Sequence, residues 1–309
     1  MNALAPAGPQ AALIAAETWY LIALTSVVFV LVAGALLIAV FRRCEDGRRA
    51  PSDRALAVAV GSALGVTVVV LIANLVIDMR VAHALDRLSA DDALTIEITG
   101  QQWWWEVEYV DDDPSRRLTT ANEIHIPAGE PVLLSLRATD VIHSFWVPRL
   151  HGKKDLIPGY TRSLWIEADE PGVFRGECAE FCGHQHAHMA LTVVAEPREQ
   201  FARWYQAQLA AAAQPVDRLR AFGREVFLSK SCPLCHTIRG TDASGRVGPE
   251  LTHVGSRTHL AAATLANDDA ALRAWIADPH DFKPGVRMPQ NPLAADELDA
   301  LVAYLRGLQ

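Results

Sequence analysis

The sequence is poor in sulfur, with only five cysteines and four methionines among its 309 residues. It also lacks an internal repeat, which excludes a solenoid or an array of small units. No combination of acid, base and nucleophile typical of covalent or acid–base catalysis is present. We therefore expect no catalytic residue of that kind, and the chemistry must come from groups that the chain binds.

Charge is missing from two long apolar runs near the N-terminus. Residues 19–41 and 55–77 each contain 23 residues without a charged side chain, which as a helix spans roughly 30 Å of hydrocarbon. A cleaved signal peptide has a basic start and a shorter apolar region, whereas the first charge here is Glu17. The sequence predicts a hairpin of two membrane helices.

The stretch between these runs predicts the orientation of the hairpin. Four of the eight residues from 42 to 49 are arginines, and positively charged loops stay on the cytoplasmic side. We expect both ends of the hairpin, and everything after about residue 79, on the periplasmic side of a bacterial inner membrane.

The net charge of −8 arises in the middle of the chain. Residues 79–214 carry 12 basic and 20 acidic groups, while the segments on either side are balanced. An acidic face near a redox centre attracts basic electron carriers, although an ordinary solvated surface explains the excess equally well.

Soft metal ligands are concentrated between Cys178 and Met189. Cys182 and His186 follow Cys178 at four-residue intervals, and His143 lies 35 residues upstream of Cys178. Thiolate, imidazole and thioether together select copper, and two thiolates can bridge two metal ions with one imidazole for each. The pattern predicts a dinuclear copper centre. The two cysteines alone would also fit a disulfide, a single-copper chaperone site or a zinc site.

A second metal motif reads Cys232-Pro-Leu-Cys235-His236. This is the pattern by which a haem is attached through two thioethers while the histidine takes an axial position. The carbonyl of Pro249 could accept a hydrogen bond from His236 and orient its ring. Met288 is placed to be the sixth ligand; the alternative is that it fills the core.

The periodicity divides the rest of the chain into a β domain and a helical domain. Short strands expected at 94–99, 123–126, 131–136, 163–166, 172–176 and 190–194 predict a β-sandwich. Helices are expected at 199–213, 216–229, 269–277 and 295–308. The predicted boundaries are 1–18 for a periplasmic N-terminal segment, 19–41 and 55–78 for the membrane helices, 42–54 for a cytoplasmic loop, 79–198 for the copper domain, 199–215 for a helical linker and 216–309 for the haem domain.

Three consecutive tryptophans occupy positions 103–105. Successive side chains on a strand point to opposite faces, so at least one indole is expected at a surface or an interface. It could be a landing site for electrons near the copper centre or part of an aromatic belt at the membrane surface.

These motifs together resemble subunit II of the haem–copper cytochrome c oxidases, in the form with a cytochrome c domain fused at its C-terminus. The strongest segments are residues 102–105, 141–148 and 176–189, and the resemblance covers nearly the whole chain. It implies a multi-domain fold: a two-helix transmembrane hairpin, an all-β cupredoxin-like Greek-key sandwich and an all-α class I cytochrome c domain.

The resemblance also implies roles for individual residues of the copper domain. The family's dinuclear CuA ligands fall on His143, Cys178, Cys182, His186, Met189 and the backbone carbonyl of Glu180. A carboxylate oxygen of Glu180 would bind Mg²⁺ or Mn²⁺ shared with subunit I. Trp103 resembles the tryptophan through which electrons enter, and residues 154–159 are similar to a segment that packs against subunit I.

In the C-terminal part, the resemblance implies one haem c bound covalently to Cys232 and Cys235, with His236 and Met288 as axial ligands. Trp275 would hydrogen-bond a haem propionate or pack in the core. The implied partners are oxidase subunits I and III, a cytochrome c or a complex that reduces it, and membrane lipid, with no role for nucleic acid.

The implied function is electron transfer within the respiratory chain. Electrons would pass from the donor through haem c and CuA to subunit I of a proton-pumping oxidase, which reduces O₂ to water. Many family members carry a glutamate at the mouth of a proton channel early in the second helix; residues 53–57 read Asp-Arg-Ala-Leu-Ala here, so that role is not transferred. Quinol-oxidising relatives lack the copper ligands, and nitrous oxide reductase needs a further histidine-rich domain. A CuA nitric oxide reductase and a lone copper chaperone or electron shuttle remain alternatives.

Overall fold

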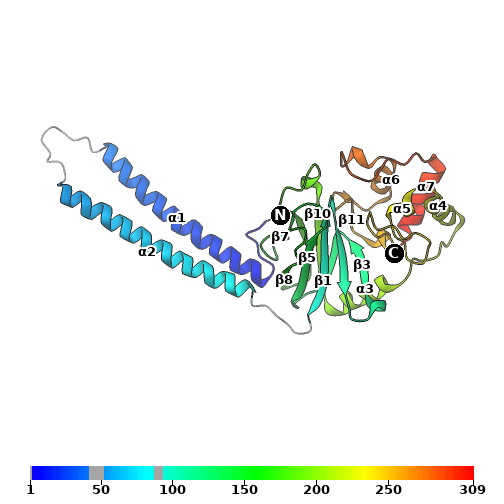
Figure 1. The fold of residues 1–309 in the computed structure, drawn as a ribbon, viewed down its shortest axis with the longest axis horizontal. Helices are drawn as coiled ribbons and strands as arrows, with labels where there is room; N and C mark the ends of the chain where they lie inside the picture. Colours follow the sequence, from blue (N-terminus) through cyan, green and yellow to red (C-terminus); the bar gives the residue numbers. More distant parts are fainter. Residues whose placement is uncertain (1, 42–51, 87–92) are drawn as a thin grey trace. The chain divides into compact units, whose positions relative to one another are not determined.

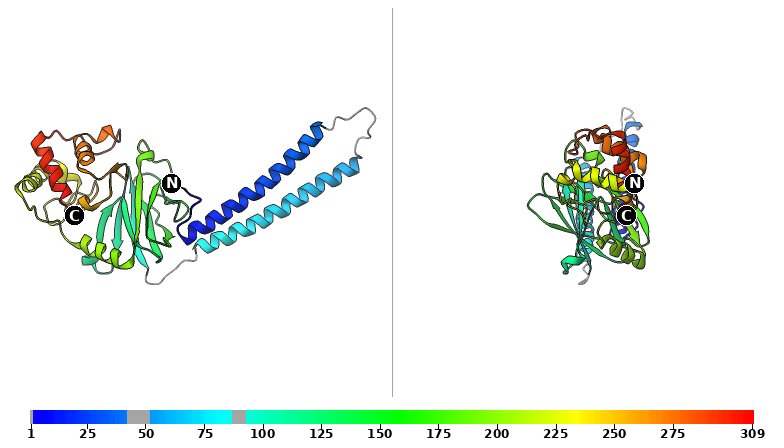
Figure 2. Two further views of the ribbon diagram at one scale, coloured as in Figure 1. Left: turned by 180° about the vertical axis from the view of Figure 1, so that it is seen from behind. Right: turned by 90° about the vertical axis from the view of Figure 1, so that its right-hand side faces the viewer.

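The structure is a computed structural model and describes residues 2–41, 52–86 and 93–309 (Figures 1 and 2). It divides into two compact units, one of residues 12–88 and the other of residues 1–11 with 89–309. The second unit contains a β-sandwich followed by a helical domain. The order of two apolar helices, sandwich and helical domain confirms the predicted fold class.

Two long helices, α1 (Pro9–Phe41) and α2 (Asp53–Asp86), make up most of the first unit. Their most apolar windows have mean hydropathies of 2.8 and 2.6, so by length and composition each could cross a membrane. α1 begins before the predicted membrane segment at Pro9, whose fixed φ suits the first turn of a helix. Of the predicted cytoplasmic loop 42–54, residues 42–51 lie outside the described residues.

Within the described part of the chain, two five-stranded sheets form the sandwich. The first has the order β3 (Leu118–Ala121), β2 (Trp104–Val110), β1 (Leu94–Gln101), β5 (Val132–Ala138) and β8 (Arg162–Ile166). The second has the order β4 (Glu123–Pro127), β10 (Ala190–Glu196), β9 (Gly172–Cys178), β6 (His143–Trp146) and β7 (Lys154–Leu156). All six expected strands are present, and β2, β3, β6 and β7 are additional.

The sandwich core follows from alternation along the strands. In β5, Val132, Leu134 and Leu136 are fully buried while the residues between them are partly exposed, as a strand with one face on the core requires. Burying each such side chain contributes about 1.5–3 kcal/mol. The indole of Trp105 makes edge-to-face contacts with the rings of Phe145 and His143, both at 6.0 Å between centroids, so the core extends to the end of the sandwich that carries His143.

The helical domain follows α3 (Arg198–Leu209) and contains α4 (Arg218–Ser229), α5 (Cys232–Cys235), α6 (Asp269–Ala277), α7 (Ala295–Arg306) and the strand pair β11 (His259–Leu260) and β12 (Leu265–Ala266). Asp217 and Asp268 cap α4 and α6 by accepting hydrogen bonds from backbone N–H groups of the first turn. α4 packs against α7 at Gly223, where a β-carbon would collide with the backbone of Ala300. The four expected helices lie close to their predicted positions.

Candidate metal centre and the adjoining cavity

The predicted copper ligands converge at one end of the sandwich. Cys178 ends β9, Cys182 lies in the following loop, and His143 opens β6, which pairs with β9. The ligand atoms of these three residues all lie within 4.8 Å of one another, and the three side chains are buried. The two sulfurs are 3.8 Å apart, well beyond the roughly 2.05 Å of a disulfide bond.

The remaining predicted ligands surround the same two sulfurs. His186 Nδ1 lies 3.7 Å and Met189 Sδ 3.8 Å from Cys182 Sγ. His143 Nδ1 is 3.9 Å from Cys178 Sγ, and the carbonyl oxygen of Glu180 is 3.2 Å from the same sulfur. The hydrogen bond from Cys182, together with His143, holds the pKa of the Cys178 thiol at about 3. Two thiols, two imidazoles, a thioether and a carbonyl form a donor set that fits copper.

Asp140 orients His143 from outside this cluster, a role not expected from the sequence. Its Oδ1 lies 2.9 Å from His143 Nε2, and its carboxylate accepts hydrogen bonds from the backbone N–H groups of Gln102 and Val141 at 2.7 Å. Burial raises the pKa of Asp140, but these hydrogen bonds outweigh it and lower the pKa overall. A carboxylate on the second imidazole nitrogen fixes the tautomer of a metal-binding histidine.

The loop between β9 and β10, residues 179–189, carries most of the predicted copper ligands and is called the copper loop. Trp103 and Gln102 hold this loop from the turn between β1 and β2. Trp103 Nε1 donates to the carbonyl of Cys182 at 3.0 Å, and Gln102 Nε2 donates to the same oxygen at 2.8 Å. Gly183 has φ +115°, and a β-carbon there would lie 3.1 Å from atoms of both side chains. This close approach favours glycine.

The three tryptophans point in different directions, as alternation predicts. Trp105 lies in the sandwich core, Trp103 faces the copper loop, and Trp104 packs with Ala121 and with Ala262 of the helical domain. Their exposed fractions are 9%, 9% and 0% for Trp103, Trp104 and Trp105. Because all three indoles are covered by protein, the aromatic-belt interpretation does not fit, and Trp104 provides the expected contact at an interface.

A cavity of about 350 Å³ lies in the helical domain beside these tryptophans. Its lining includes Cys232, Cys235, His236, Met288, Trp275 and, from the sandwich, Trp103 and Trp104. The two cysteines lie on the single turn of α5. The motif that predicts a covalent haem and the proposed sixth ligand thus open onto one cavity.

The ring of His236 is held as its motif predicts. Its Nδ1 lies 2.7 Å from the Pro249 carbonyl. Burial lowers the pKa of His236 and favours the neutral imidazole that binds iron. A β-carbon at Gly248 would lie only 2.6 Å from the ring, so glycine is needed there. Two thiols on one turn, an oriented imidazole and largely apolar walls fit a covalently bound haem.

The other residues near the two sites lie at the surface or in neighbouring elements. His184 and His188, which flank the predicted ligand His186, are exposed. The carboxylate of Glu180 is partly exposed and lies 3.7 Å from Lys153 Nζ, while its carbonyl faces Cys178. Asp53 is the exposed first residue of α2, and residues 154–156 form β7.

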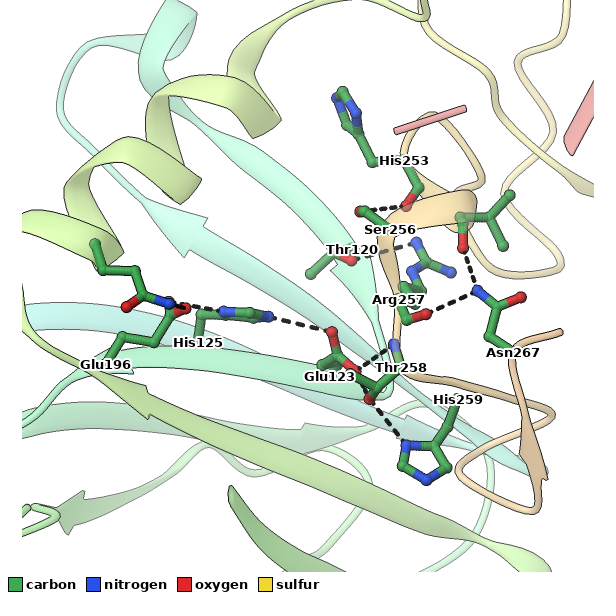
Figure 3. A network of polar contacts seen from close by, with 12 residues as sticks. Thr120, Glu123, His125, Glu196, His253, Ser256, Arg257, Thr258, His259 and Asn267 are labelled. Carbon is green, nitrogen blue, oxygen red and sulfur yellow. Dashed lines mark hydrogen bonds and ion pairs between the residues drawn. The ribbon is translucent and has the colours of Figure 1, made fainter. Parts of the chain in front are cut away.

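A buried polar network that the sequence did not reveal joins the sandwich to the helical domain (Figure 3). The Nδ1 of His125 lies 3.0 Å from Glu196 Oε2, and its Nε2 lies 3.2 Å from Glu123 Oε1. The ring of His125 also stacks on Trp204, with 4.0 Å between the ring centroids. The other oxygen of Glu123 accepts hydrogen bonds from the backbone N–H of Thr258, at 2.9 Å, and from its hydroxyl. Burial lowers the pKa of His125, but the two carboxylates outweigh it and raise the pKa overall.

Comparison with known proteins relates the sandwich and the helical domain to known families. Residues 94–196 match the family described as cytochrome c oxidase subunit II, periplasmic domain, and residues 221–309 match the cytochrome c family. A solved structure of the periplasmic domain of subunit II of cytochrome oxidase from Bradyrhizobium japonicum is 30% identical, with a TM-score of 0.36, covering 39% of this chain and 95% of that one.

Two curated relatives are each named cytochrome c oxidase subunit 2. The protein from Alkalihalophilus pseudofirmus is 42% identical, and the match covers 71% of this chain and 62% of that protein. The protein from Bacillus sp. strain PS3 is 33% identical, and the match covers 72% of this chain and 65% of that protein. The chain thus spans just under two thirds of the length of these relatives. Residues 94–196 belong to the cytochrome c oxidase subunit II periplasmic-domain family, and a cytochrome c domain follows them at residues 221–309.

Proposed function

We propose that this chain is the subunit of a proton-pumping terminal oxidase at which electrons enter. Electrons from a cytochrome c donor would pass through covalent haem c and dinuclear CuA to subunit I, which reduces O₂ to water. The observation that carries the proposal is the position of Trp103, which lines the haem cavity and also donates a hydrogen bond to the carbonyl of Cys182.

Each proposed group has residues suited to hold it. His143, Cys178, Cys182, His186, Met189 and the carbonyl of Glu180 would hold two copper ions, and Cys232, Cys235, His236 and Met288 would hold haem c. When bound, these groups would supply one-electron transfer. The chain's own residues would fix the ligands: Asp140 orients His143, and Pro249 orients His236. Ligands held rigidly rearrange little when the charge changes, which favours fast electron transfer.

We further propose that the two apolar helices anchor the chain in the bacterial inner membrane, with both termini and both redox domains in the periplasm. Subunits I and III, membrane lipid, and a cytochrome c or a complex that reduces it would be the partners. The Glu180 carboxylate, being partly exposed, remains available for Mg²⁺ at the boundary with subunit I.

The direct test is purification of the membrane complex in mild detergent, followed by assays of O₂ and NO consumption. We expect the chain to copurify with a large haem-containing membrane subunit and to support O₂ consumption driven by reduced cytochrome c. NO turnover without O₂ turnover would assign it to a nitric oxide reductase. A chain that purifies without such a partner would be a chaperone or an independent shuttle.

A further inference from the structure

Lys283 of the helical domain is buried where that domain meets the copper loop. Its side chain is 1% exposed. Its ammonium group donates to the backbone carbonyls of Trp103, at 3.2 Å, and Ala261, at 3.3 Å. Lysine is among the residues least often fully buried, and burial lowers the pKa of this one to about 8. A buried ammonium between two carbonyls indicates a specific role at this contact.

The residues that follow Lys283 continue the contact. Gln185, next to the predicted ligand His186, donates from Nε2 to the Pro284 carbonyl at 2.5 Å. Arg287 donates to Gln102 Oε1 at 2.7 Å and lies 3.8 Å from Asp140 Oδ2. The segment 283–287 therefore touches the residues that hold the copper loop, and it ends immediately before Met288.

The turn at residues 261–263 also belongs to this contact. Ala261, Ala262 and Ala263 have φ values of 53°, 56° and 55°, a left-handed conformation that alanine rarely adopts. Each of the three carbonyls accepts a hydrogen bond, from Lys283, from the N–H of Ala190 at 3.2 Å and from Arg175 at 2.9 Å, respectively. These hydrogen bonds hold residues 261–263 in this conformation. The carbonyl of Ala261 is thereby fixed where it accepts from Lys283.

We propose that Lys283 is the positioning residue for electron transfer between the two centres: it holds the Met288 segment of the haem domain against Trp103 and the copper loop. This inference rests on the proposed function. The same contact bears on where electrons enter, because the docked haem domain covers Trp103, which is only 9% exposed. A soluble donor therefore cannot reach Trp103 directly and must deliver electrons to the haem domain.

The test compares the full-length chain with Lys283→Met, which keeps the side-chain length but removes the charge and the donors. Lys230→Met is the control for losing a lysine charge from the haem domain, because Lys230 pairs with Glu297 in α7 of the same domain. The structural readout is hydrogen–deuterium exchange of the segments 99–105 and 261–264, measured on metal-free and loaded protein. The functional readout is the rate of haem-to-copper electron transfer after flash reduction of the haem.

We expect Lys283→Met to raise exchange in both segments and to slow electron transfer about tenfold or more, since rates that depend on geometry fall steeply with small displacements. The haem and copper spectra should be unchanged, and Lys230→Met should behave as the parent protein. Arg287→Gln, which changes an exposed residue of the same contact, should have a smaller effect in the same direction. Unchanged exchange in both interface variants would overturn the proposal.

The two proposals fail in different ways. If the parent protein binds no copper pair or no haem, the proposed function fails, while exchange in the metal-free chain still shows whether Lys283 docks the domains. If both groups bind and Lys283→Met alters neither exchange nor transfer rate, only the positioning role is refuted.

Discussion

The indole nitrogen of Trp103 lies 3.0 Å from the carbonyl oxygen of Cys182, to which it donates a hydrogen bond. Through this bond, a residue that lines the predicted haem cavity also holds the loop that carries the predicted copper ligands. The two predicted redox sites therefore share a side chain, and no separate element is needed to connect them.

Replacing Trp103 by phenylalanine tests this connection. Trp103→Phe keeps an apolar ring but removes the donor, which we expect to cost about 1 kcal/mol of stability and to slow haem-to-copper electron transfer. The copper content should be unchanged because Gln102 still donates to the Cys182 carbonyl. Flash reduction followed by optical spectroscopy measures the rate. Trp165→Phe on β8 is the control, and an equal loss of rate in both variants would refute a specific role for Trp103.

The His125 network predicts a pH dependence of stability. The pKa of His125 is raised in the folded protein because the nearby carboxylates outweigh the effect of burial. A group with a raised folded pKa stabilises the protein below its unfolded pKa, and this stabilisation is lost as the pH rises through the folded value. The melting temperature should therefore fall as the pH rises above about 6.5, the ordinary pKa of histidine.

His125→Gln should remove most of that pH dependence. It should also lower stability by about 3–5 kcal/mol, the usual cost of removing one partner from a buried ion pair. Thermal unfolding of the full-length chain across this pH range is the measurement, with His280→Gln in the haem domain as control. An unaltered pH profile in His125→Gln would show that other groups are responsible.

Gly248→Ala tests the haem cavity. The added β-carbon would lie 2.6 Å from Cε1 of His236 and 3.0 Å from its Nδ1, so the ring must move away from the Pro249 carbonyl. We expect reduced haem incorporation and loss of the low-spin optical spectrum. Gly65→Ala is a matched control, because a β-carbon there meets no atom within 4 Å. A normal haem spectrum in Gly248→Ala would contradict the axial role of His236.

Met288→Leu tests the sixth ligand. Loss of the thioether should lower the haem reduction potential by an amount on the order of a tenth of the roughly 0.8 V range that axial ligands span. The copper spectrum should stay intact. Redox titration of the purified protein measures the potential, with Met79→Leu in α2 as control. An unmoved potential would mean that Met288 fills the core instead.

Local motifs made much of the candidate sites predictable. Cys178, Cys182, His186 and Met189 occur within one loop, so their spacing alone indicates a soft-metal site. The motif that predicts haem attachment is likewise contained in five consecutive residues, from Cys232 to His236. His143 was more distant in sequence, and the pairing of β6 with β9 brings it to the cysteines.

The parts that could not be predicted depend on contacts between distant segments. Asp140 is the exception, because it lies only three residues before His143 and becomes its partner through the turn that precedes β6. Lys283 gave no signal, because a lysine in a sequence is by default a surface residue. Glu123 and His125 lie two apart on one face of β4, but their partners Thr258 and Glu196 come from elements 70 or more residues away.

The most direct test of the central claim is copper and haem quantification together with an EPR spectrum of the purified full-length protein. We predict two coppers for each covalent haem, with one unpaired electron shared between the two copper ions. One copper or none, with Cys178 and Cys182 joined as a disulfide, would contradict a dinuclear centre and the electron-transfer function built on it.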